Sequence, residues 1–465
     1  SRSSAASDVY KRQHLFQTSK LAKKDIKLGI DLDLLMILTL VGMLLAIFSG
    51  VHIALALGAT AMIGTYFIFE DMYMAASQVG GAAYELIRDH IFMTIPLFVL
   101  MGDFLSRSGA AGDLYSLINK GLKGVPGRLG VATVTGNAAF AAVTGTSIAS
   151  AAAFSRIAWP EMKKAGYDQK LAVGSIAGSA CLGMLIPPSV LLIVWGIITE
   201  DSIGKLFVAG VIPGIILSLM FAFYNFSKSV INPKLAPEPD SIGDLTKLTS
   251  KQIISGLSIL GLIVVVLGGI WGGIFTPTEA AGMGALASFG IALFKGMRWN
   301  GIVESVIDAG KTSAPIMILL ITAGMYSRFL SLSDIDSVIV DAMASVGLNS
   351  FMILVMMVVI WLILGMLLDS ISIILLTVPL FVLLAGDMNP YAFAIFGILA
   401  IEAGLLTPPF GLIVYTVKGV LAAGGDNVSL GSIFKGSIPY WIMMLIVMLL
   451  VAFFPELASW PTQFV

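Results

Sequence analysis

Long apolar stretches alternate with short polar connections from about residue 32 to the end of the chain. Several approach the roughly 20 apolar residues that a membrane-spanning helix needs. They lie at about 32–49, 51–69, 131–157, 170–199 and 205–227, and again at about 253–275, 278–295, 349–383, 391–417 and 437–454. Spanning β-strands would instead give shorter segments of alternating hydrophobicity. The pattern therefore predicts an all-α polytopic membrane protein.

Features of the first half recur in the same order in the second half. A shorter, proline-interrupted apolar piece, a Ser-containing break and a double proline appear once in each half. Pro96 matches Pro315, Ser147 matches Ser370, and Pro187-Pro188 match Pro408-Pro409, at separations of 219, 223 and 221 residues. These matches predict an internal repeat, with a first unit at 32–231, a polar linker at 232–252 and a second unit at 253–465.

Each unit is expected to hold five full spans and one re-entrant hairpin, near 82–109 in the first and near 300–330 in the second. An odd number of spans inverts the second unit relative to the first. Inverted repeats whose broken helices meet near the bilayer midplane are a recurring plan of secondary transporters. The Lys and Arg counts leave the sidedness open, because 156–170 favours one orientation while the basic start and 88–128 favour the other.

The composition supports the assignment as a membrane protein and reduces the number of possible functions. The 465 residues are 57% hydrophobic and 12% charged, whereas soluble domains carry about 25% charged residues. The net charge is −1, so nothing suggests a nucleic-acid partner. The polar, basic stretch 1–31 has no apolar region of its own, and we interpret it as a disordered or non-native leader.

Six short stretches break the helical pattern. They are "MTIP" (93–96), "VTGTSIAS" (143–150), "LIPPS" (185–189), "KTSAP" (311–315), "GMLLDSIS" (365–372) and "LLTPPFG" (405–411). A lone proline favours a simple kink, but a double proline repeated in both halves favours a built site. Freed backbone groups survive at membrane depth only inside protein or beside a watery cavity. We therefore expect these breaks to present carbonyls, amides and hydroxyls to a ligand.

Hydroxyl and carboxylate oxygens in the breaks are candidate ligands for Na⁺. They belong to Thr144, Thr146, Ser147, Thr312, Ser313, Asp369 and Ser370. Helix N-termini at the same breaks favour a substrate carboxylate. Glu402 is also within an apolar run, and intramembrane acids are functional by default. A bond to neighbouring backbone or a scaffold contact explains Glu402 equally well.

Other polar residues have local explanations. Glu279 is expected to cap a helix that begins at Thr276-Pro277. Asp103 and Arg107, four residues apart, predict a local ion pair, and Asn137 predicts a hydrogen bond between helices.

Catalytic motifs are absent from the sequence. Gly310-Lys311-Thr312 invites a phosphate-loop interpretation, but the required earlier glycine is replaced by Ser305 and no strand precedes it. No HExxH or GxSxG motif is present. Cys181 is the only cysteine, so no disulfide within the chain is possible and a structural zinc site is improbable. The sequence does not favour an enzyme.

Five segments together resemble the large membrane subunit of tripartite ATP-independent periplasmic (TRAP) transporters, the DctM-like family. They are "VTGTSIASAAAFSRIAWPEMKKAGYD", "LGMLIPPSVLLIVWGIITEDSIGKLFVAGVIPG", "GIFTPTEAAG", "LGMLLDSISIILLTVPL" and "EAGLLTPPFGL". The resemblance extends over nearly the whole chain after residue 34. It implies an elevator-type, Na⁺-driven importer of small organic anions, such as C4-dicarboxylates, 2-oxo acids or sialic acids, in the bacterial inner membrane. It also implies two partners, a small four-helix membrane subunit and a periplasmic substrate-binding protein.

By position, the resemblance implies a role for particular residues. It places Thr94 and Thr312-Ser313 at the two hairpin tips, and Thr144 to Ser147 and Asp369-Ser370 in the broken helices. The residues beside the substrate would be Pro188, Ser189, Thr407 and Pro408.

The chain departs from the family pattern at two positions. His52 replaces a turn proline, and Ile413 stands where the family often has Asn. The second departure puts a ligand role at that position in doubt.

Three alternatives compete with this interpretation. A stand-alone divalent-anion/Na⁺ symporter would share the inverted-repeat plan but need no binding protein. An assembly subunit would use the breaks only for helix packing, and an intramembrane enzyme would need a nucleophile-base pair, for which the sequence shows no candidate.

Overall fold

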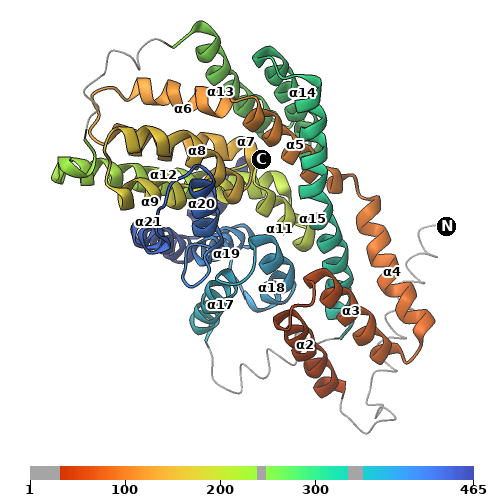
Figure 1. The fold of residues 1–465 in the computed structure, drawn as a ribbon. Helices are drawn as coiled ribbons and strands as arrows, with labels where there is room; N and C mark the ends of the chain where they lie inside the picture. Colours follow the sequence, from red (N-terminus) through yellow and green to blue (C-terminus); the bar gives the residue numbers. More distant parts are fainter. Residues whose placement is uncertain (1–31, 238–247, 334–348) are drawn as a thin grey trace.

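The computed structural model describes residues 32–237, 248–333 and 349–465, and all regular structure in these ranges is helical (Figure 1). An all-α fold was the sequence prediction, and it is confirmed. The predicted leader, 1–31, and residues 238–247 of the predicted linker lie outside the described residues.

The described helices between residues 32 and 237 fall into two runs. The first contains α2 (Leu32–Phe48), α3 (Ile53–Phe69), α4 (Met72–Arg88), η1 (His90–Met93), α5 (Thr94–Arg107) and α6 (Ala110–Gly121). The second contains α7 (Arg128–Thr144), α8 (Ser147–Lys164), α9 (Gln169–Ala180), α10 (Leu182–Leu185), α11 (Val190–Thr199), α12 (Ile203–Ile231) and η2 (Pro233–Leu235).

The described helices after residue 247 also fall into two runs. The first contains α13 (Ser250–Trp271), α14 (Pro277–Lys295) and α15 (Trp299–Ser333). The second contains α17 (Ser350–Gly365), α18 (Ser370–Leu384), α19 (Pro390–Gly404), α20 (Leu412–Ala423), α21 (Leu430–Phe453), α22 (Glu456–Ser459) and η3 (Trp460–Phe464).

Length and hydropathy are sufficient for membrane crossing in six helical stretches of the described chain. These are His90–Arg107, Gln169–Thr199, Ile203–Ile231, Ser250–Trp271, Trp299–Ser333 and Leu430–Phe453. Shorter apolar helices, such as α3 and α19, lie between them. The multi-pass membrane architecture expected from the apolar stretches is therefore present.

The helices pack as two groups (Figure 1). We call α2–α5 with α13–α15 the arm, because α15 packs along α3, α4 and α5 while α14 packs on α5. We call α7–α12 with α17–α21 the core, in which α9 packs on α7, α8 and α21, and α19 packs on α17 and α21. Contacts of α5 with α7 and of α15 with α18 join the two groups.

Within the core, one order of elements occurs twice. A pair of helices joined by a tight turn (α7 and α8, then α17 and α18) is followed by a broken helix (α9–α11, then α19–α20) and one long helix (α12, then α21). The two pairs open toward opposite ends. The end of α8 lies beside the α20–α21 connection through Lys163 and Asp426, whereas the end of α18 shares a small pocket with Thr199, at the far end of the first broken helix. The second set is inverted relative to the first.

The hairpins are not where the sequence analysis expected them. The hairpin near 300–330 is wrong, because α15 continues without a break from Trp299 to Ser333, with Pro315 inside it. Near 82–109, α4 and α5 are separated by η1 and do not pack as a pair. Pro96 is the third residue of α5, in the first turn, where a helix does not need the missing amide.

The true hairpins lie within two stretches that were predicted to be single spans, 131–157 and 349–383. Each stretch contains two helices and a turn, at Gly145-Thr146 in the first and at 366–369 in the second. The turns are only two and four residues long and lie between apolar helices, so each hairpin resembles one long apolar stretch in the sequence.

Glycines allow close backbone contact where the long helix α21 crosses α9. A Cβ atom on Gly174 would lie 2.2 Å from the carbonyl oxygen of Gly436. Small residues at such crossings are typical of membrane helix packing, because they let two backbones approach.

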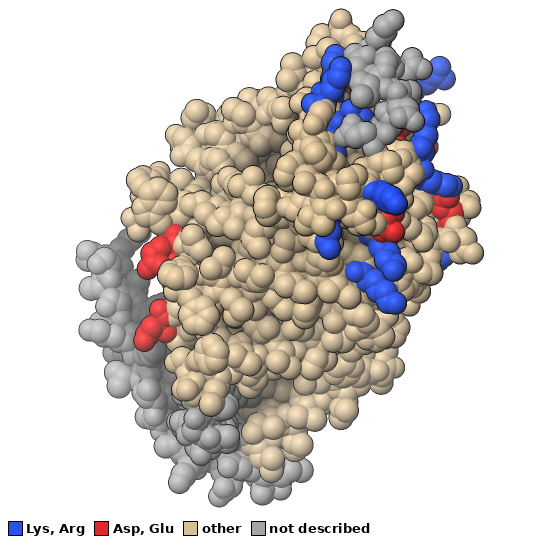
Figure 2. Space-filling model, turned by 90° about the vertical axis from the view of Figure 1, so that its left-hand side faces the viewer, with Lys and Arg blue, Asp and Glu red and all other residues tan. Residues whose placement is uncertain are grey.

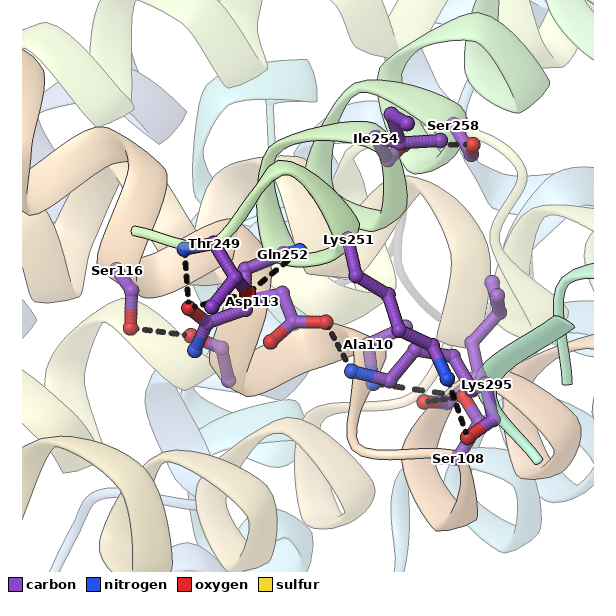
Figure 3. Close-up of polar contacts among 12 residues, drawn as sticks. Ser108, Ala110, Asp113, Ser116, Thr249, Lys251, Gln252, Ile254, Ser258 and Lys295 are labelled. Carbon is purple, nitrogen blue, oxygen red and sulfur yellow. Dashed lines mark hydrogen bonds and ion pairs between the residues drawn. The ribbon is translucent and has the colours of Figure 1, made fainter. Parts of the chain in front are cut away.

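The two ends of the molecule differ in charge. At one end, which we call the basic end, helix termini and connections carry many Lys and Arg residues: Arg128, Lys163, Lys164, Lys170, Lys228, Lys234, Lys251, Lys295, Lys418 and Lys435. Figure 2 shows Lys and Arg gathered toward the upper right of one face, beside a broad surface without charged residues. Figure 3 shows Lys295 paired with Asp113 of α6, while Lys251 of α13 reaches the carbonyl oxygen of Lys295 at 3.5 Å.

The opposite end carries a pocket with acidic walls. The pocket has a volume of about 910 Å³, and the ends of α4, α11 and α15 contribute to it. Its lining includes Glu85, Asp89, Glu200, Asp201 and Arg328. We call this the acidic end.

Asp426 ties the first hairpin to the second repeat at the basic end. Its carboxylate accepts a hydrogen bond from Trp159 Nε1 at 2.7 Å and also pairs with Lys163, and both partners are on α8. The hydrogen bonds from Lys163 and Trp159 lower the pKa of Asp426 below its ordinary value.

Replacing Asp426 by Asn is expected to lower thermal stability at neutral pH but not in acid. A carboxyl whose pKa is lower in the folded state stabilises above its unfolded pKa of about 4 and loses that contribution as pH falls through the folded value. Melting of the solubilised protein and of D426N should therefore differ at pH 7 and converge below pH about 4. A difference that stayed constant over this range would contradict the role of the charge.

Candidate functional site

The turn between α7 and α8 forms the first hairpin tip. Gly145 has φ +61°, in the left-handed region, and a Cβ atom on it would lie 2.8 Å from the carbonyl oxygen of Pro188. Glycine is needed for both reasons. The carbonyl oxygen of Gly145 accepts a hydrogen bond from the Val190 amide at 3.1 Å. The tip is therefore packed against the first double-proline break.

Three hydroxyls cluster at this tip. Thr146 is extended, precedes the first residue of α8 and makes no capping bond with its half-buried side chain. Thr144 donates to the Phe140 carbonyl oxygen at 3.0 Å, and Ser147 is completely buried. Among the residues that the structure describes, the Thr146 hydroxyl has no hydrogen-bond partner, which leaves it available to a ligand.

The second hairpin tip is capped by an acid. Asp369 precedes α18, and its Oδ1 accepts hydrogen bonds from the amides of Ile371 and Ser372, each at 3.1 Å. The Ser372 hydroxyl donates to the other carboxylate oxygen. Asp369 remains partly exposed, so a negative charge stands at the edge of this tip.

Glu402 connects the two tips. Ser147 Oγ donates to Glu402 Oε2 at 2.5 Å, and Ser370 Oγ donates to Glu402 Oε1 at 2.7 Å. The Glu402 residue is 1% exposed. Ser147 and Ser370, matched across the repeat in the sequence analysis, therefore meet at one carboxylate.

The two double-proline breaks lie next to the tips. Each break contains one cis peptide bond, Pro187-Pro188 in the first and Pro408-Pro409 in the second. Ser189 caps α11 by accepting from the Leu192 amide at 3.4 Å and donates to the Met184 carbonyl oxygen at 2.5 Å.

The exposure of the two breaks differs. Pro188 is buried against the first tip, whereas Thr407 is half-buried and Pro408 is exposed. Trp441 Nε1 donates to the Thr407 hydroxyl at 3.1 Å. The second break is therefore the more open of the two.

Close helix contacts hold these breaks in place. A Cβ atom on Gly404 would lie 2.8 Å from Gly365 Cα, which ties the start of the second break to the second hairpin. In the first repeat, a Cβ atom on Gly183 would lie 2.7 Å from the Thr146 carbonyl oxygen. At both places no side chain separates the two backbones.

The predicted Na⁺ ligands are only partly brought together. Thr144, Thr146, Ser147, Asp369 and Ser370 lie at the two tips joined by Glu402.

Thr94, Thr312 and Ser313 belong to the arm, and their expected position at hairpin tips is wrong. The Thr94 hydroxyl pairs with the Thr278 hydroxyl of α14 at 2.7 Å. Thr312 is exposed within α15, and Ser313 is buried there with no partner for its hydroxyl among the described residues. A proline near a hydroxyl looks the same at a hairpin tip and inside a continuous helix.

The predicted helix cap at Glu279 and the predicted hydrogen bond between helices at Asn137 are confirmed. Glu279 and Thr276 form a reciprocal capping box at the start of α14. Asn137 Nδ2 donates to Ser179 Oγ at 2.7 Å between α7 and α9.

Arg107 has more partners than the sequence predicted. It pairs with Asp103 at 2.8 Å, as expected, and also with Glu304 at 2.8 Å and with Asp308, both of α15. These additional pairs tie α5 to α15 within the arm.

The two departures from the family pattern have structural explanations. His52 Nδ1 accepts from the Ala54 amide at 3.3 Å and so caps α3. Ile413 is fully buried at the start of α20, where an apolar side chain is well accommodated.

The bridging role of Glu402 was not predicted, although the sequence carries a signal for it. When the two double prolines are superimposed, "CLGMLIPP" aligns with "EAGLLTPP" and Cys181 takes the position of Glu402. The acid therefore sits at a matched position of the repeat.

Comparisons with known proteins agree with this architecture. Residues 40–457 match the family described as "Tripartite ATP-independent periplasmic transporter, DctM component". A C4-dicarboxylate TRAP transporter large permease protein of Pseudomonas aeruginosa is 31% identical over 81% of this chain and 87% of its own length. An ectoine TRAP large permease of Halomonas elongata is 28% identical over 91% and 97%.

A third relative and one solved structure extend the comparison. A sialic acid TRAP large permease of Vibrio cholerae is 27% identical over 83% of this chain and 88% of its own. The crystal structure of the Alcanivorax borkumensis YdaH transporter aligns with a TM-score of 0.55 and 13% identity, over 84% of this chain and 89% of that one. At 13% identity, the likeness to the YdaH transporter concerns the fold alone.

Proposed function

The chain belongs to the DctM component family of tripartite ATP-independent periplasmic transporters, and from this premise we propose that it imports a small organic anion together with Na⁺. It is the large permease subunit of such a transporter. The substrate reaches it from a periplasmic binding protein, and a small four-helix membrane subunit completes the complex in the bacterial inner membrane.

The convergence of the two hairpin tips carries the proposal. Ser147 and Ser370, from opposite repeats, reach the two oxygens of one buried carboxylate. Around them lie the hydroxyl of Thr146 and the carboxylate of Asp369, oxygen donors of the hard type that suits Na⁺. The first turns of α8 and α18 also offer positive dipole ends to a substrate carboxylate.

Charge distribution supports an orientation. Lys and Arg are enriched in cytoplasmic connections of membrane proteins, so the basic end would face the cytoplasm. The acidic end, with its pocket between arm and core, would then face the periplasm and the binding protein.

The division into arm and core supports an elevator motion. Both hairpins and both broken helices belong to the core, whereas the arm consists of uninterrupted helices apart from the α4–α5 junction. The core would move across the membrane against the arm and carry the site with it.

The names of the relatives indicate the substrate class. Three of the relatives are named for C4-dicarboxylates, ectoine and sialic acid, and each of these compounds carries a carboxylate, whereas another is named for isethionate, a sulfonate. We therefore propose a solute that carries a carboxylate. A C4-dicarboxylate is the first candidate, because the P. aeruginosa relative is named as a transporter of C4-dicarboxylates.

Reconstituted vesicles test the proposal. Vesicles that contain this chain, its small subunit and its loaded binding protein should accumulate labelled substrate only under an inward Na⁺ gradient. Each positive charge entering contributes about 2.3 kcal/mol per 100 mV, so net entry of positive charge would make uptake faster with a negative interior. Equal uptake with K⁺ replacing Na⁺, or uptake driven by a proton gradient alone, would refute Na⁺ coupling.

A further inference from the structure

The matched positions Cys181 and Glu402 lie side by side where the two repeats meet. Both precede a double proline by six residues. Cys181 Sγ lies 3.9 Å from the backbone carbonyl oxygen of Glu402, and both side chains are buried. The approximate two-fold axis that relates the two repeats therefore passes close to this pair.

A carboxylate is itself two-fold symmetric, and this explains how one acid can serve both repeats. Its two equivalent oxygens accept from Ser147 and from Ser370, which are the first residues of α8 and α18. A second carboxylate at position 181 would place like charges together in a medium of low dielectric constant. The small, neutral side chain of Cys181 avoids that repulsion.

The buried carboxylate of Glu402 is stabilised by hydroxyl groups and by helix N-termini. None of the ion pairs found among the described residues includes it. A buried charge is tolerated only when other polar groups compensate it. Here two serine donors and the positive ends of two helices do so, and both helices are thereby drawn toward one point.

We propose that Glu402 is a positioning residue that fixes the spacing between the first turns of α8 and α18, so that the two hairpin tips act as one Na⁺-binding unit. This inference rests on the proposed function, because it assumes that the tips bind Na⁺. Thr146 and Asp369 immediately precede Ser147 and Ser370. Any change in the spacing of the serines therefore moves both groups of candidate ligands.

Removal of the bridge should weaken Na⁺ binding more than substrate binding. Glu402→Ala, Ser147→Ala and Ser370→Ala are each expected to raise the half-saturating Na⁺ concentration about tenfold, which corresponds to 1.4 kcal/mol. Glu402→Gln keeps one acceptor oxygen and the side-chain length, so it should fall between Glu402→Ala and the unmodified protein. Ser437→Ala removes a buried hydroxyl whose hydrogen bond in the described part of the chain is to the Ile433 carbonyl oxygen of its own helix, and it should leave the Na⁺ response unchanged.

A double-substitution cycle separates a shared bridge from independent contacts. If the serines act through Glu402, adding Ser147→Ala or Ser370→Ala to Glu402→Ala should cause little further loss. Additive effects would overturn the proposal. If Glu402→Ala fails to fold, the same prediction applies between the two serine variants, whose combined effect should be smaller than the sum of the single effects.

A binding measurement on the solubilised chain gives a second readout. Na⁺ should raise the melting temperature of the unmodified protein in excess of equal K⁺, and this excess should shrink in the three alanine variants but not in Ser437→Ala. An unmodified protein that ignores Na⁺, in uptake and in melting, would refute the proposed function itself. A normal Na⁺ response in the unmodified protein and in all three alanine variants would refute only the role of Glu402.

Discussion

Substitution of Asp369 by Asn is expected to abolish most Na⁺-driven uptake without unfolding the second hairpin. Asn caps helices as well as Asp does, and its side-chain oxygen can still accept from the amides of Ile371 and Ser372. The second carboxylate oxygen, which accepts from the Ser372 hydroxyl, becomes an amide nitrogen, and that hydroxyl can turn to accept from it. The change that remains is the loss of the negative charge, at a partly exposed position beside the Na⁺ candidates. Loss of a charged partner costs about 1.5–3 kcal/mol, so uptake at limiting Na⁺ should fall by about ten- to a hundredfold.

Asp168 provides the matched control for this change. It caps α9 by accepting from the Leu171 amide at 3.0 Å, near the basic end and away from both tips. Asp168→Asn should therefore retain Na⁺-driven uptake. Full uptake by Asp369→Asn, measured at limiting Na⁺ in the same vesicles, would remove Asp369 from the proposed Na⁺ site.

Asp369→Ala distinguishes the cap from the charge. It removes both, and loss of an N-cap costs about 1 kcal/mol of stability. We expect Asp369→Ala to melt at a lower temperature than Asp369→Asn, with the same loss of Na⁺-driven uptake. Equal melting temperatures would show that the amide contacts of Asp369 contribute little to α18.

Gly404→Val is expected to disrupt the core most strongly among single substitutions near the second break. A Cβ atom at this position would lie 2.8 Å from Gly365 Cα and 3.1 Å from the Trp361 carbonyl oxygen. Both are backbone atoms, so α17 and α19 must separate. Overpacking of this kind typically costs about 1–3 kcal/mol, and separation of the two helices would also shift the second tip and Glu402.

Gly419→Val is the matched control for this substitution. Gly419 is within α20, and no described atom outside its own stretch of helix lies within 4 Å of the position that its Cβ would occupy. Gly404 is the last residue of α19 and Gly419 is inside α20, and the helix propensities of Gly and Val differ by less than about 1 kcal/mol. A larger difference in stability between the two variants therefore reports the α17–α19 contact. A Gly404→Val protein that melts and transports like Gly419→Val would contradict the close approach.

Local signals explain why parts of the site were predictable. The double prolines, the Ser-containing breaks and the acid at Asp369 are visible as interruptions of apolar stretches, because a break in a membrane helix leaves polar groups that must be satisfied. Thr144, Thr146, Ser147, Asp369 and Ser370 were found in this way. Thr94, Thr312 and Ser313 were grouped with them because a neighbouring proline gives the same local pattern.

The role of Glu402 could not be predicted from the local sequence. The sequence left a ligand role and a scaffold contact equally open, since an acid in an apolar helix is compatible with both. Its two serine partners are 255 and 32 residues away. No spacing rule connects residues at such separations, and only the tertiary fold brings the first residues of α8 and α18 to one carboxylate of α19.

The sequence by itself determined the class of protein, the repeated order of its interruptions and its family. Hydropathy and proline act through the backbone within one or two helical turns, so these properties can be read along the chain. The tertiary structure decided which apolar stretches fold back as hairpins, which of the matched interruptions meet, and that one acid joins them. Those outcomes depend on contacts between distant segments, at glycines such as Gly145 and Gly404, where two backbones approach too closely for any side chain.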